Sequence, residues 1–495
     1  MKKFNRFAFI ALLGIIFLLL LYKARTLPVV NDESPTAVTY INYSVWEIMM
    51  YPDHWPNNHI LNTLFTKLFV GLFGNEQWVI RLPNLLSFLL YGFAIFRINK
   101  IVLKEDSVFF LPAALLFVSN PYLLDFFGVC RGYGMSCALA TLSVSYLISG
   151  YRDSKVSAVW IALMLSMLAS YANFTLLVFW GATSLWVWFY FFSKSEKHLR
   201  QIIRPTVVIG ILTILYLALI ANPMIKMHST DEFQYWTSRG FYRDTIFPLI
   251  GYSRNGSPLI LGISSHLIAG FIFMTIVVNL IYIFIHFRRS NYDPASLKQP
   301  VFVTTVLLLS TAFINIVQCH VLKTPNLHGR TALFFYPLFI VVFVGLLGIL
   351  PVSKYGLAKK IIAFCFAFIC IFHLAGSFKL NWVRDYWHDV NTFEVLEYLE
   401  NMHTCEPVTL KTSWFFYHSF YYYVYTGKIP WLKLEDYDQS MDLNTRAEYY
   451  YIFSEDLKLL EPAFEPVQKF GNNRVLVKRK EENQFQSAGD SNNQN

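Results

Sequence analysis

Charged residues are scarce in this sequence. Asp, Glu, Lys and Arg together make up 15% of its 495 residues, whereas a soluble domain carries about 25%. Hydrophobic residues make up 55% instead, and many apolar runs approach the roughly 20 residues that cross a bilayer as a helix. The composition excludes a soluble globular protein. The long runs also exclude a transmembrane β-barrel, whose strands alternate apolar and polar residues. We therefore expect an all-α polytopic membrane protein.

Cysteine patterns and nucleic-acid motifs are lacking as well. The six cysteines lie mostly in or beside apolar runs, and no pair has zinc-ligand spacing, so a disulfide framework is not indicated. The net charge of +9 comes from Lys and Arg in short loops between apolar runs, where the orientation signals of membrane proteins lie. No basic motif with interleaved aromatics stands clear of the membrane, and we expect no nucleic-acid partner.

The apolar runs predict about eleven transmembrane helices. The first run follows Lys2, Lys3 and Arg6, and no small-x-small cleavage site comes after it, which is typical of an uncleaved signal anchor. The predicted spans are 7–22, 81–99, 108–124, 133–150, 157–172, 174–192, 206–221, 259–286, 301–321, 332–350 and 361–378.

Basic residues concentrate in alternate loops and so predict the topology. Loops near 97–104, 152–155, 194–204, 288–298 and 354–360 are all basic, which places the N-terminus in the cytoplasm. The outer side then receives the loops 23–80, 125–131, 222–258 and 322–331. An apolar segment at 59–73 would reverse every later loop if it crossed the membrane. Its leucines and phenylalanines share one helical face, so we expect an interfacial amphipathic helix on the outer side.

The C-terminal part is a different kind of sequence. Residues 1–380 form the predicted transmembrane domain, whose outer loop 23–80 carries amphipathic helices, and residues 381–480 form a small α/β domain. The odd number of spans places this domain outside the cytoplasm. We expect helices at 391–402 and 413–428, strands at 406–413 and 448–453, a hairpin at 467–480 with its turn at 471–473, and a disordered tail at 481–495.

An adjacent pair of acids, Asp32 and Glu33, follows the first span. These carboxylates can act as a general base, hold a divalent metal ion or simply form the polar flank of a span. Asp32 or Ser34 can also cap a helix over 34–50.

Other ionisable residues lie in the outer loops. His59 begins the predicted interfacial helix and is either a cap or surface residue, or else a ligand or proton relay. Arg81 either extends toward the membrane surface from its span or pairs with a phosphate or the acids. Asp125 and Arg131-Gly132-Tyr133 lie at the mouth of two spans, where ionisable groups are costly and usually functional.

Three basic residues in the last outer loop run against the orientation rule. Lys323, His328 and Arg330 need another reason to lie outside, and binding an anionic headgroup or phosphate supplies one. Together the outer loops offer carboxylates, a histidine and arginines at one membrane face. That set suits a reaction on a lipid-linked phosphate, since carboxylates can activate a hydroxyl and basic groups can neutralise a departing phosphate.

The sequence resembles the GT-C membrane glycosyltransferases that use polyprenyl-phosphate sugars, the superfamily of the protein O-mannosyltransferases and the lipid A aminoarabinose transferase. The resemblance covers about the first 350 residues. It is carried by Asp32-Glu33 after the first span, by His59 followed by Leu72-Phe73-Gly74 and Arg81-Leu82-Pro83, by NPYLLDFFGVCRGYGMS (120–136) and by HGRTALFFYPLF (328–339). Ile60 and Leu61 depart from the family's Pro-Pro after the histidine.

The resemblance implies a role for each matching residue. Asp32 resembles the acid that acts as catalytic base, with Glu33 beside it, and Asp125 lies in the loop where relatives carry a second acid. Arg131 and Arg330 are the implied contacts to the donor phosphate. Asp32, Glu33 and Asp125 are also the candidate ligands of a divalent ion, Mg or Mn.

The resulting expectation is an integral membrane glycosyltransferase of the bacterial inner membrane with a periplasmic active site. It would transfer a sugar from polyprenyl phosphate to a lipid, glycan or protein acceptor, by an inverting single displacement, among membrane lipids. Two alternatives remain at this point: a transporter or flippase of lipid-linked sugars, and a non-catalytic scaffold for envelope assembly.

Overall fold

The structure, a computed structural model, describes residues 1–480 except 195–198, 229–238, 253–257, 292, 351–355, 403–405, 442, 444 and 472. The predicted tail at 481–495 and part of the hairpin turn at 471–473 therefore lie outside the described residues. Two compact units are present. The membrane unit comprises Met1–Arg25, Tyr43–Gly74 and Trp78–Leu380, and the C-terminal unit comprises Thr26–Asn42, Asn75–Gln77 and Asn381–Asn495.

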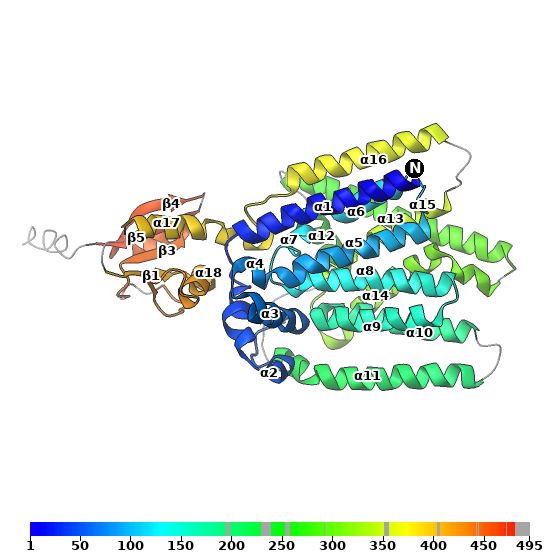
Figure 1. Cartoon of the computed structure of the whole chain (residues 1–495), viewed down its shortest axis with the longest axis horizontal. Helices are drawn as coiled ribbons and strands as arrows, with labels where there is room; N and C mark the ends of the chain where they lie inside the picture. Colours follow the sequence, from blue (N-terminus) through cyan, green and yellow to red (C-terminus); the bar gives the residue numbers. More distant parts are fainter. Residues whose placement is uncertain are drawn as a thin grey trace, which may run out of the picture. The chain divides into compact units, whose positions relative to one another are not determined.

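Long apolar helices build the membrane unit (Figure 1). Eight segments in the described part of the chain are long and apolar enough to cross a membrane. They contain α1 (Lys2–Thr26), α5 (Leu82–Val102), α10 (Leu177–Lys194), α11 (Leu199–His228), α13 (Pro258–Arg289), α14 (Pro300–Leu322), α15 (Phe335–Ile349) and α16 (Gly356–Ser377), with the short turns η3 (Phe174–Leu176) and η7 (Gly329–Ala332) leading into α10 and α15.

Three further predicted spans are helical, but the predicted number of eleven is not confirmed. Helix α6 (Phe110–Val118) is short, and α9 (Val156–Ala172) is apolar but has only 17 residues. Helix α8 (Gly132–Arg152) is rich in Gly, Ala and Ser and packs between α5 and α9. Small residues allow such close approach between helices inside a membrane protein.

Shorter helices complete the membrane unit. They are α2 (Val45–Met49), α3 (Ile60–Phe73), α4 (Gln77–Ile80), α7 (Pro121–Asp125), α12 (Phe247–Tyr252), η5 (Tyr242–Ile246) and η6 (Pro294–Lys298).

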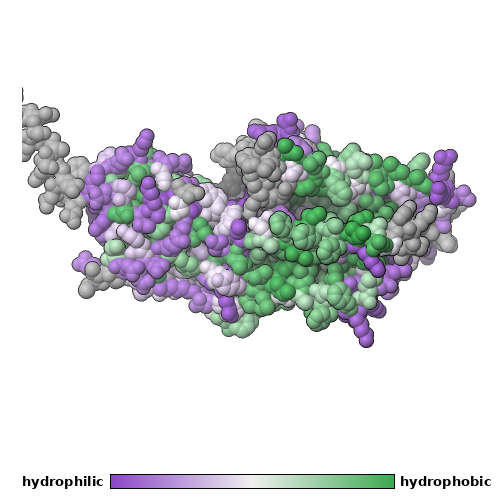
Figure 2. All heavy atoms as spheres, turned by 90° about the horizontal axis from the view of Figure 1, so that it is seen from above, coloured by the Kyte–Doolittle hydropathy of each residue, from purple (hydrophilic) through white to green (hydrophobic). Residues whose placement is uncertain are grey.

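The face of the membrane unit seen in the space-filling view is largely apolar (Figure 2). On α13 and α16, Leu267, Phe364 and Phe372 are each at least 70% exposed. Water-soluble proteins do not expose large apolar side chains at this density, whereas a lipid environment suits them. The chain is an integral membrane protein, and the predicted all-α membrane fold with a small C-terminal α/β part is confirmed.

Helix α3 has the predicted amphipathic pattern, with its polar side turned inward. Asn62, Thr63 and Thr66 are fully buried, whereas Leu68 and Leu72 are exposed. Asn84 of α5 donates to the side-chain oxygen of Asn62 over 2.8 Å, so the polar face is satisfied by protein. The apolar face is available to lipid, and the interfacial position of α3 stays a prediction.

A five-stranded mixed sheet organises the C-terminal unit. Strand order is β2-β1-β3-β5-β4; β1 pairs parallel with β2 and β3, and β5 pairs antiparallel with β3 and β4. The strands are β1 (Val408–Thr412), β2 (Leu432–Leu434), β3 (Tyr449–Phe453), β4 (Phe464–Phe470) and β5 (Arg474–Arg479).

Helices accompany this sheet along the chain. They are η1 (Pro35–Thr39), η2 (Tyr40–Asn42), η8 (Arg384–Asn391), α17 (Thr392–Met402), α18 (Trp414–Tyr425), η9 (Ser454–Asp456) and α19 (Leu457–Leu460). Helix α18 connects the parallel strands β1 and β2, and Gly427 ends this segment with a positive φ of 71°, as a helix-terminating glycine does. The predicted helices, strands and hairpin are confirmed within the described residues. Residues 26–42, which the sequence placed with the transmembrane domain, group with this unit.

Ile452 of β3 tests how the sheet is stabilised. Its side chain is fully buried in an apolar cluster with Val475 and Val477. Ile452→Ala should therefore destabilise the unit by about 2–5 kcal/mol and speed amide hydrogen exchange in β3 and β5 of the full-length protein. Leu459→Ala, at a position 58% exposed, is the control and should leave exchange unchanged. Equal exchange in both variants would contradict this packing.

Candidate active site

The two adjacent acids have different surroundings within the C-terminal unit. Glu33 is fully buried, and its Oε2 accepts the backbone N–H of Val30 over 3.0 Å, closing its own turn. Asp32 is half-buried, and its Oδ2 accepts the hydroxyl of Tyr386 over 2.9 Å. Glu33 thus closes its own turn, whereas Asp32 is oriented by a tyrosine hydroxyl from a distant part of the chain.

A continuous helix over 34–50 is not formed, and that expectation is wrong. Pro35 opens a five-residue π-helical turn, η1, which passes into η2 and then, after a break, into α2. Ser34 makes no side-chain cap. Ser44 instead caps α2 in a capping box with Glu47, which satisfies the first free N–H groups of that helix.

A third carboxyl group, Asp389 of η8, lies in the same unit and was not found from the sequence. It is 1% exposed, and its two oxygens accept the N–H of Asn31 (2.8 Å) and the hydroxyl of Ser419 (2.7 Å). Burial raises the pKa of Asp389 to about 8, and the nearby charges of Asp32 and Glu33 add to the effect. Asp389 therefore keeps its proton over much of the pH range in which an ordinary aspartate is ionised.

A histidine of α18 also lies within electrostatic reach of Asp32. Burial lowers the pKa of His418, although the negative charge of Asp32 opposes that shift. The imidazole is therefore mostly neutral at physiological pH.

In the membrane unit, three predicted site residues come together around the aromatic ring of a fourth, Tyr133. The ring of His59 lies 4.8 Å from that of Tyr133, and the guanidinium carbons of Arg131 and Arg330 lie 5.9 and 5.8 Å from its centroid. We call His59, Arg131, Tyr133 and Arg330 the Tyr133 cluster. Two guanidinium groups beside one ring concentrate positive charge and provide forked donors suited to a phosphate.

The Tyr133 cluster depends on close backbone packing. Arg131 is 1% exposed, precedes α8 and donates to the carbonyl oxygen of Asn57 over 3.1 Å and to its side-chain oxygen. A Cβ on the next residue, Gly132, would lie 2.1 Å from the carbonyl oxygen of Ala172 and 2.8 Å from Cβ of His59. Only glycine fits there, because real Cβ atoms do not come so close.

Asp125 and Arg81 lie in a second charged group, at the end of α1. The Nζ of Lys23 is 2.5 Å from Oδ1 of Asp125 and donates to the carbonyl oxygen of Lys379 over 2.8 Å. Arg81, fully buried, donates to the carbonyl oxygen of Ala24 over 2.9 Å. Both predicted site residues thus have partners that fix helix ends. Lys23, which follows the first predicted span (7–22), was not among the predicted site residues.

Lys323 and His328 lie at the two ends of the segment between α14 and η7. Lys323 is exposed at the end of α14 with a positive φ of 55°. His328 precedes η7, its N–H donates to the hydroxyl of Thr331 over 2.8 Å, and its Nδ1 lies 2.9 Å from the carbonyl oxygen of Asp244. These contacts hold the loop before Arg330 against η5.

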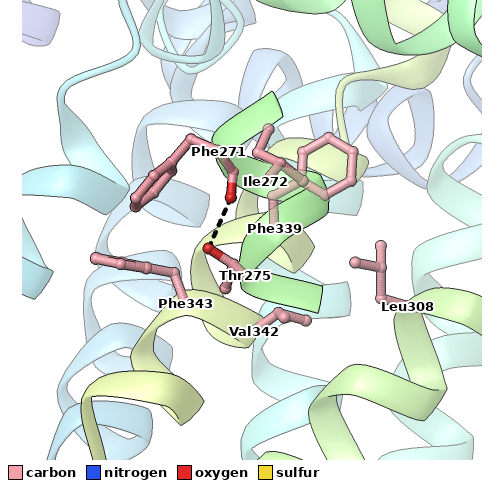
Figure 3. A pocket seen from close by; sticks show the side chains of 7 residues that line it. All are labelled: Phe271, Ile272, Thr275, Leu308, Phe339, Val342 and Phe343. Atoms are coloured by element: carbon pink, nitrogen blue, oxygen red, sulfur yellow. Dashed lines mark hydrogen bonds between the residues drawn. The ribbon is translucent and has the colours of Figure 1, made fainter. Parts of the chain in front are cut away.

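A small cavity lies between α13, α14 and α15 of the membrane unit. It is lined by Phe271, Ile272, Thr275, Leu308, Phe339, Val342 and Phe343 (Figure 3). Its volume of about 20 Å³ is room for a single water. Its one polar side chain, Thr275, donates to the carbonyl oxygen of Phe271 over 2.9 Å.

The predicted metal ligands do not assemble as a metal site. Among the described residues, no three His, Cys, Asp or Glu side chains come together in a way that would hold an ion. Asp125 faces Lys23, and Glu33 accepts a backbone N–H. We therefore derive no step through a divalent ion.

The ion pair between Lys23 and Asp125 should be essential for stability. Both side chains are at most 9% exposed, and removing one partner of a buried pair costs about 3–5 kcal/mol. Asp125→Asn should lower the thermal stability of the purified protein strongly. Lys23→Met combined with Asp125→Asn should recover much of it, because no buried charge remains. A double variant that is less stable than Asp125→Asn would contradict this role.

Asp389 should make the C-terminal unit less stable as pH rises. Its folded-state pKa of about 8 exceeds the unfolded value of about 3.9, so only the folded state holds the proton between these values. This contribution is complete below pH 4 and is lost as pH rises through 8. Hydrogen exchange in β3 and β5, corrected for intrinsic rates, should show this loss between pH 5 and 8. Asp389→Asn, which cannot ionise, should flatten it. The same pH dependence in both proteins would contradict the shift.

Comparisons with known proteins identify the fold. No protein-family model matches the sequence, and no curated protein matches it. Among solved structures, ArnT from Cupriavidus metallidurans bound to undecaprenyl phosphate superposes with a TM-score of 0.51 at 11% sequence identity, covering 96% of this chain and 98% of that one. The archaeal oligosaccharyltransferase AglB from Archaeoglobus fulgidus, in complex with an inhibitory peptide and a dolichol-phosphate, gives a TM-score of 0.46 at 10% identity, covering 95% and 74%. Over almost its whole length, the chain has the GT-C fold of ArnT.

Proposed function

We propose that this chain is a glycosyltransferase that takes a sugar from polyprenyl phosphate and transfers it to an acceptor hydroxyl. The observation that carries the proposal is the Tyr133 cluster, in which Arg131 and Arg330 converge on one ring, in a chain with the fold of ArnT. That relative was solved with undecaprenyl phosphate, a lipid phosphate of the proposed donor class.

The donor phosphate is assigned to the Tyr133 cluster. A polyprenyl-phosphate sugar carries negative charge on its phosphodiester, and this charge grows on the departing oxygen as the glycosidic bond breaks. Arg131 is buried and held by Asn57, so its guanidinium is fixed before the donor binds. Charge that is already in place at a leaving group lowers the barrier without reorganisation in the transition state.

The base role is assigned to Asp32. Its carboxylate accepts the proton of the acceptor hydroxyl while the acceptor oxygen attacks the anomeric carbon. The bond between that carbon and the phosphate oxygen breaks, and polyprenyl phosphate leaves with the bonding electrons. One displacement of this kind inverts the anomeric centre. Glu33, whose carboxylate accepts the backbone N–H of Val30 in its own turn, supports the position of Asp32.

The proposed location follows from the basic loops. With the N-terminus in the cytoplasm, Asp32 and the C-terminal unit lie on the outer face of a bacterial inner membrane. Lipid-linked donors on that face serve lipid, glycan or protein acceptors, so the enzyme would act in envelope glycan synthesis.

Asp32→Asn tests the base directly. A positioned general base contributes about 10²–10⁴-fold to rate, so the variant should lose at least 100-fold in sugar transfer. The assay uses proteoliposomes supplied with the lipid extract and acceptor of cells that lack this protein, in which donor accumulates. Asp106→Asn, at an exposed acid, is the control and should keep full activity.

The same assay separates transfer from transport. A flippase would move the lipid-linked sugar across the bilayer without forming a glycosylated product, and a scaffold would do neither. Unchanged transfer by Asp32→Asn, with the purified protein fully folded, would remove Asp32 as the base.

A further inference from the structure

The short helix η8 contacts the segment that carries Asp32 at two consecutive residues. Tyr386 donates its hydroxyl to Oδ2 of Asp32 over 2.9 Å, and Asp389 accepts the backbone N–H of Asn31 over 2.8 Å. The side chains of Tyr386 and Asp389 are nearly fully buried, at 3% and 1% exposure. One contact orients the carboxylate, and the other holds the backbone just before it.

Helix η8 is itself anchored to the sheet and to α18. Arg474 of β5 donates to the carbonyl oxygens of Trp387 (2.9 Å) and His388 (3.3 Å), and its guanidinium lies 5.5 Å from the Trp387 ring centroid. Ser419 of α18 donates to the second oxygen of Asp389. The positions of Tyr386 and Asp389 are therefore set by the folded C-terminal unit and not by a mobile loop.

Helix α18 makes hydrogen bonds to two other segments of this unit. The N–H of Val29 donates to the hydroxyl of Tyr423 over 2.9 Å, and Tyr422 donates its own hydroxyl to the carbonyl oxygen of Asn75 over 2.8 Å. Tyr422 and Tyr386 thus form a matched pair. Each is a buried tyrosine that donates one hydrogen bond within this unit, but only Tyr386 donates to the carboxylate.

We propose that Tyr386 and Asp389 are positioning residues for the reaction, with Tyr386 fixing the carboxylate of Asp32 and Asp389 fixing the Asn31-Asp32 backbone. This inference rests on the proposed role of Asp32 as base. It assigns the C-terminal unit a role in catalysis and not only in binding. A base must be held in hydrogen-bonding geometry with the proton it removes, and small displacements of such a group lower the rate of the chemical step.

Tyr386→Phe and Tyr422→Phe separate positioning from stability. A hydrogen bond to a charged group contributes about 1.5–3 kcal/mol, which corresponds to about 10–100-fold in rate. In the proteoliposome assay, Tyr386→Phe should lower kcat by about tenfold or more. Its KM for the donor extract and its binding of undecaprenyl phosphate should stay within twofold of the parent. Tyr422→Phe should keep the parent kcat.

Asp389 offers a rescue test. Asp389→Asn keeps an oxygen that can accept the Asn31 N–H and should retain most of kcat, whereas Asp389→Ala removes the acceptor and should lower kcat as Tyr386→Phe does. Equal loss of kcat in both Asp389 variants would overturn the positioning role of that residue.

The outcomes distinguish this inference from the proposed function. If Asp32→Asn abolishes transfer while Tyr386→Phe keeps the parent kcat, the positioning role is wrong and the proposed function stands. If both tyrosine variants lose kcat and thermal stability to the same extent, the role of Tyr386 is structural and the inference fails. If Asp32→Asn transfers sugar normally, the base assignment and this inference both fail.

Discussion

The cost of burying charge in an apolar protein dominates this structure. A charged side chain away from water is tolerated only when a partner offsets the lost hydration. The protein meets this demand at helix ends, where Lys23 pairs with Asp125 and Arg81 caps the backbone of α1. Asp125 and Arg81 were both predicted as site residues, and their roles stay predictions. The Tyr133 cluster is a separate set of basic groups in the membrane unit, and its two arginines suit an anionic ligand.

The C-terminal unit applies the same rule to carboxylates. Three acids lie close enough to influence one another, and the surroundings of each carboxyl group differ. Glu33 is closed into its turn, Asp389 is buried and binds its proton more tightly, and Asp32 receives the hydroxyl of Tyr386. Because neighbouring negative charges oppose one another, protonation of Asp389 reduces the repulsion around Asp32. Of the three acids, Asp32 is thus the one whose carboxylate is oriented by a tyrosine hydroxyl.

Much of the fold could be predicted from the sequence, because the signals for helices, strands and turns are local. Apolar runs identify the membrane helices, period-two segments and glycine identify the strands and turns, and the polarity switch near residue 380 separates the two kinds of sequence. The sequence placed His59, Arg131 and Arg330 at one membrane face but did not predict that they would gather around Tyr133, and their role stays a proposal. Long-range partners could not be predicted. Nothing in a span flank shows that Lys23 meets Asp125, and nothing near residue 386 shows that η8 contacts residues 31 and 32, some 350 positions earlier. The helix expected over 34–50 is divided, because Ser44 and Glu47 form a capping box that begins a new helix at Val45.

The stereochemistry of the product gives the sharpest test of the proposed single displacement. A single displacement with Asp32 as base inverts the anomeric carbon, whereas a two-step reaction through a covalent sugar intermediate retains its configuration. NMR of the transferred sugar, compared with the polyprenyl-phosphate donor purified from cells that lack the protein, distinguishes the two. We expect opposite anomeric configurations in donor and product. A product with the donor's configuration would exclude the single displacement.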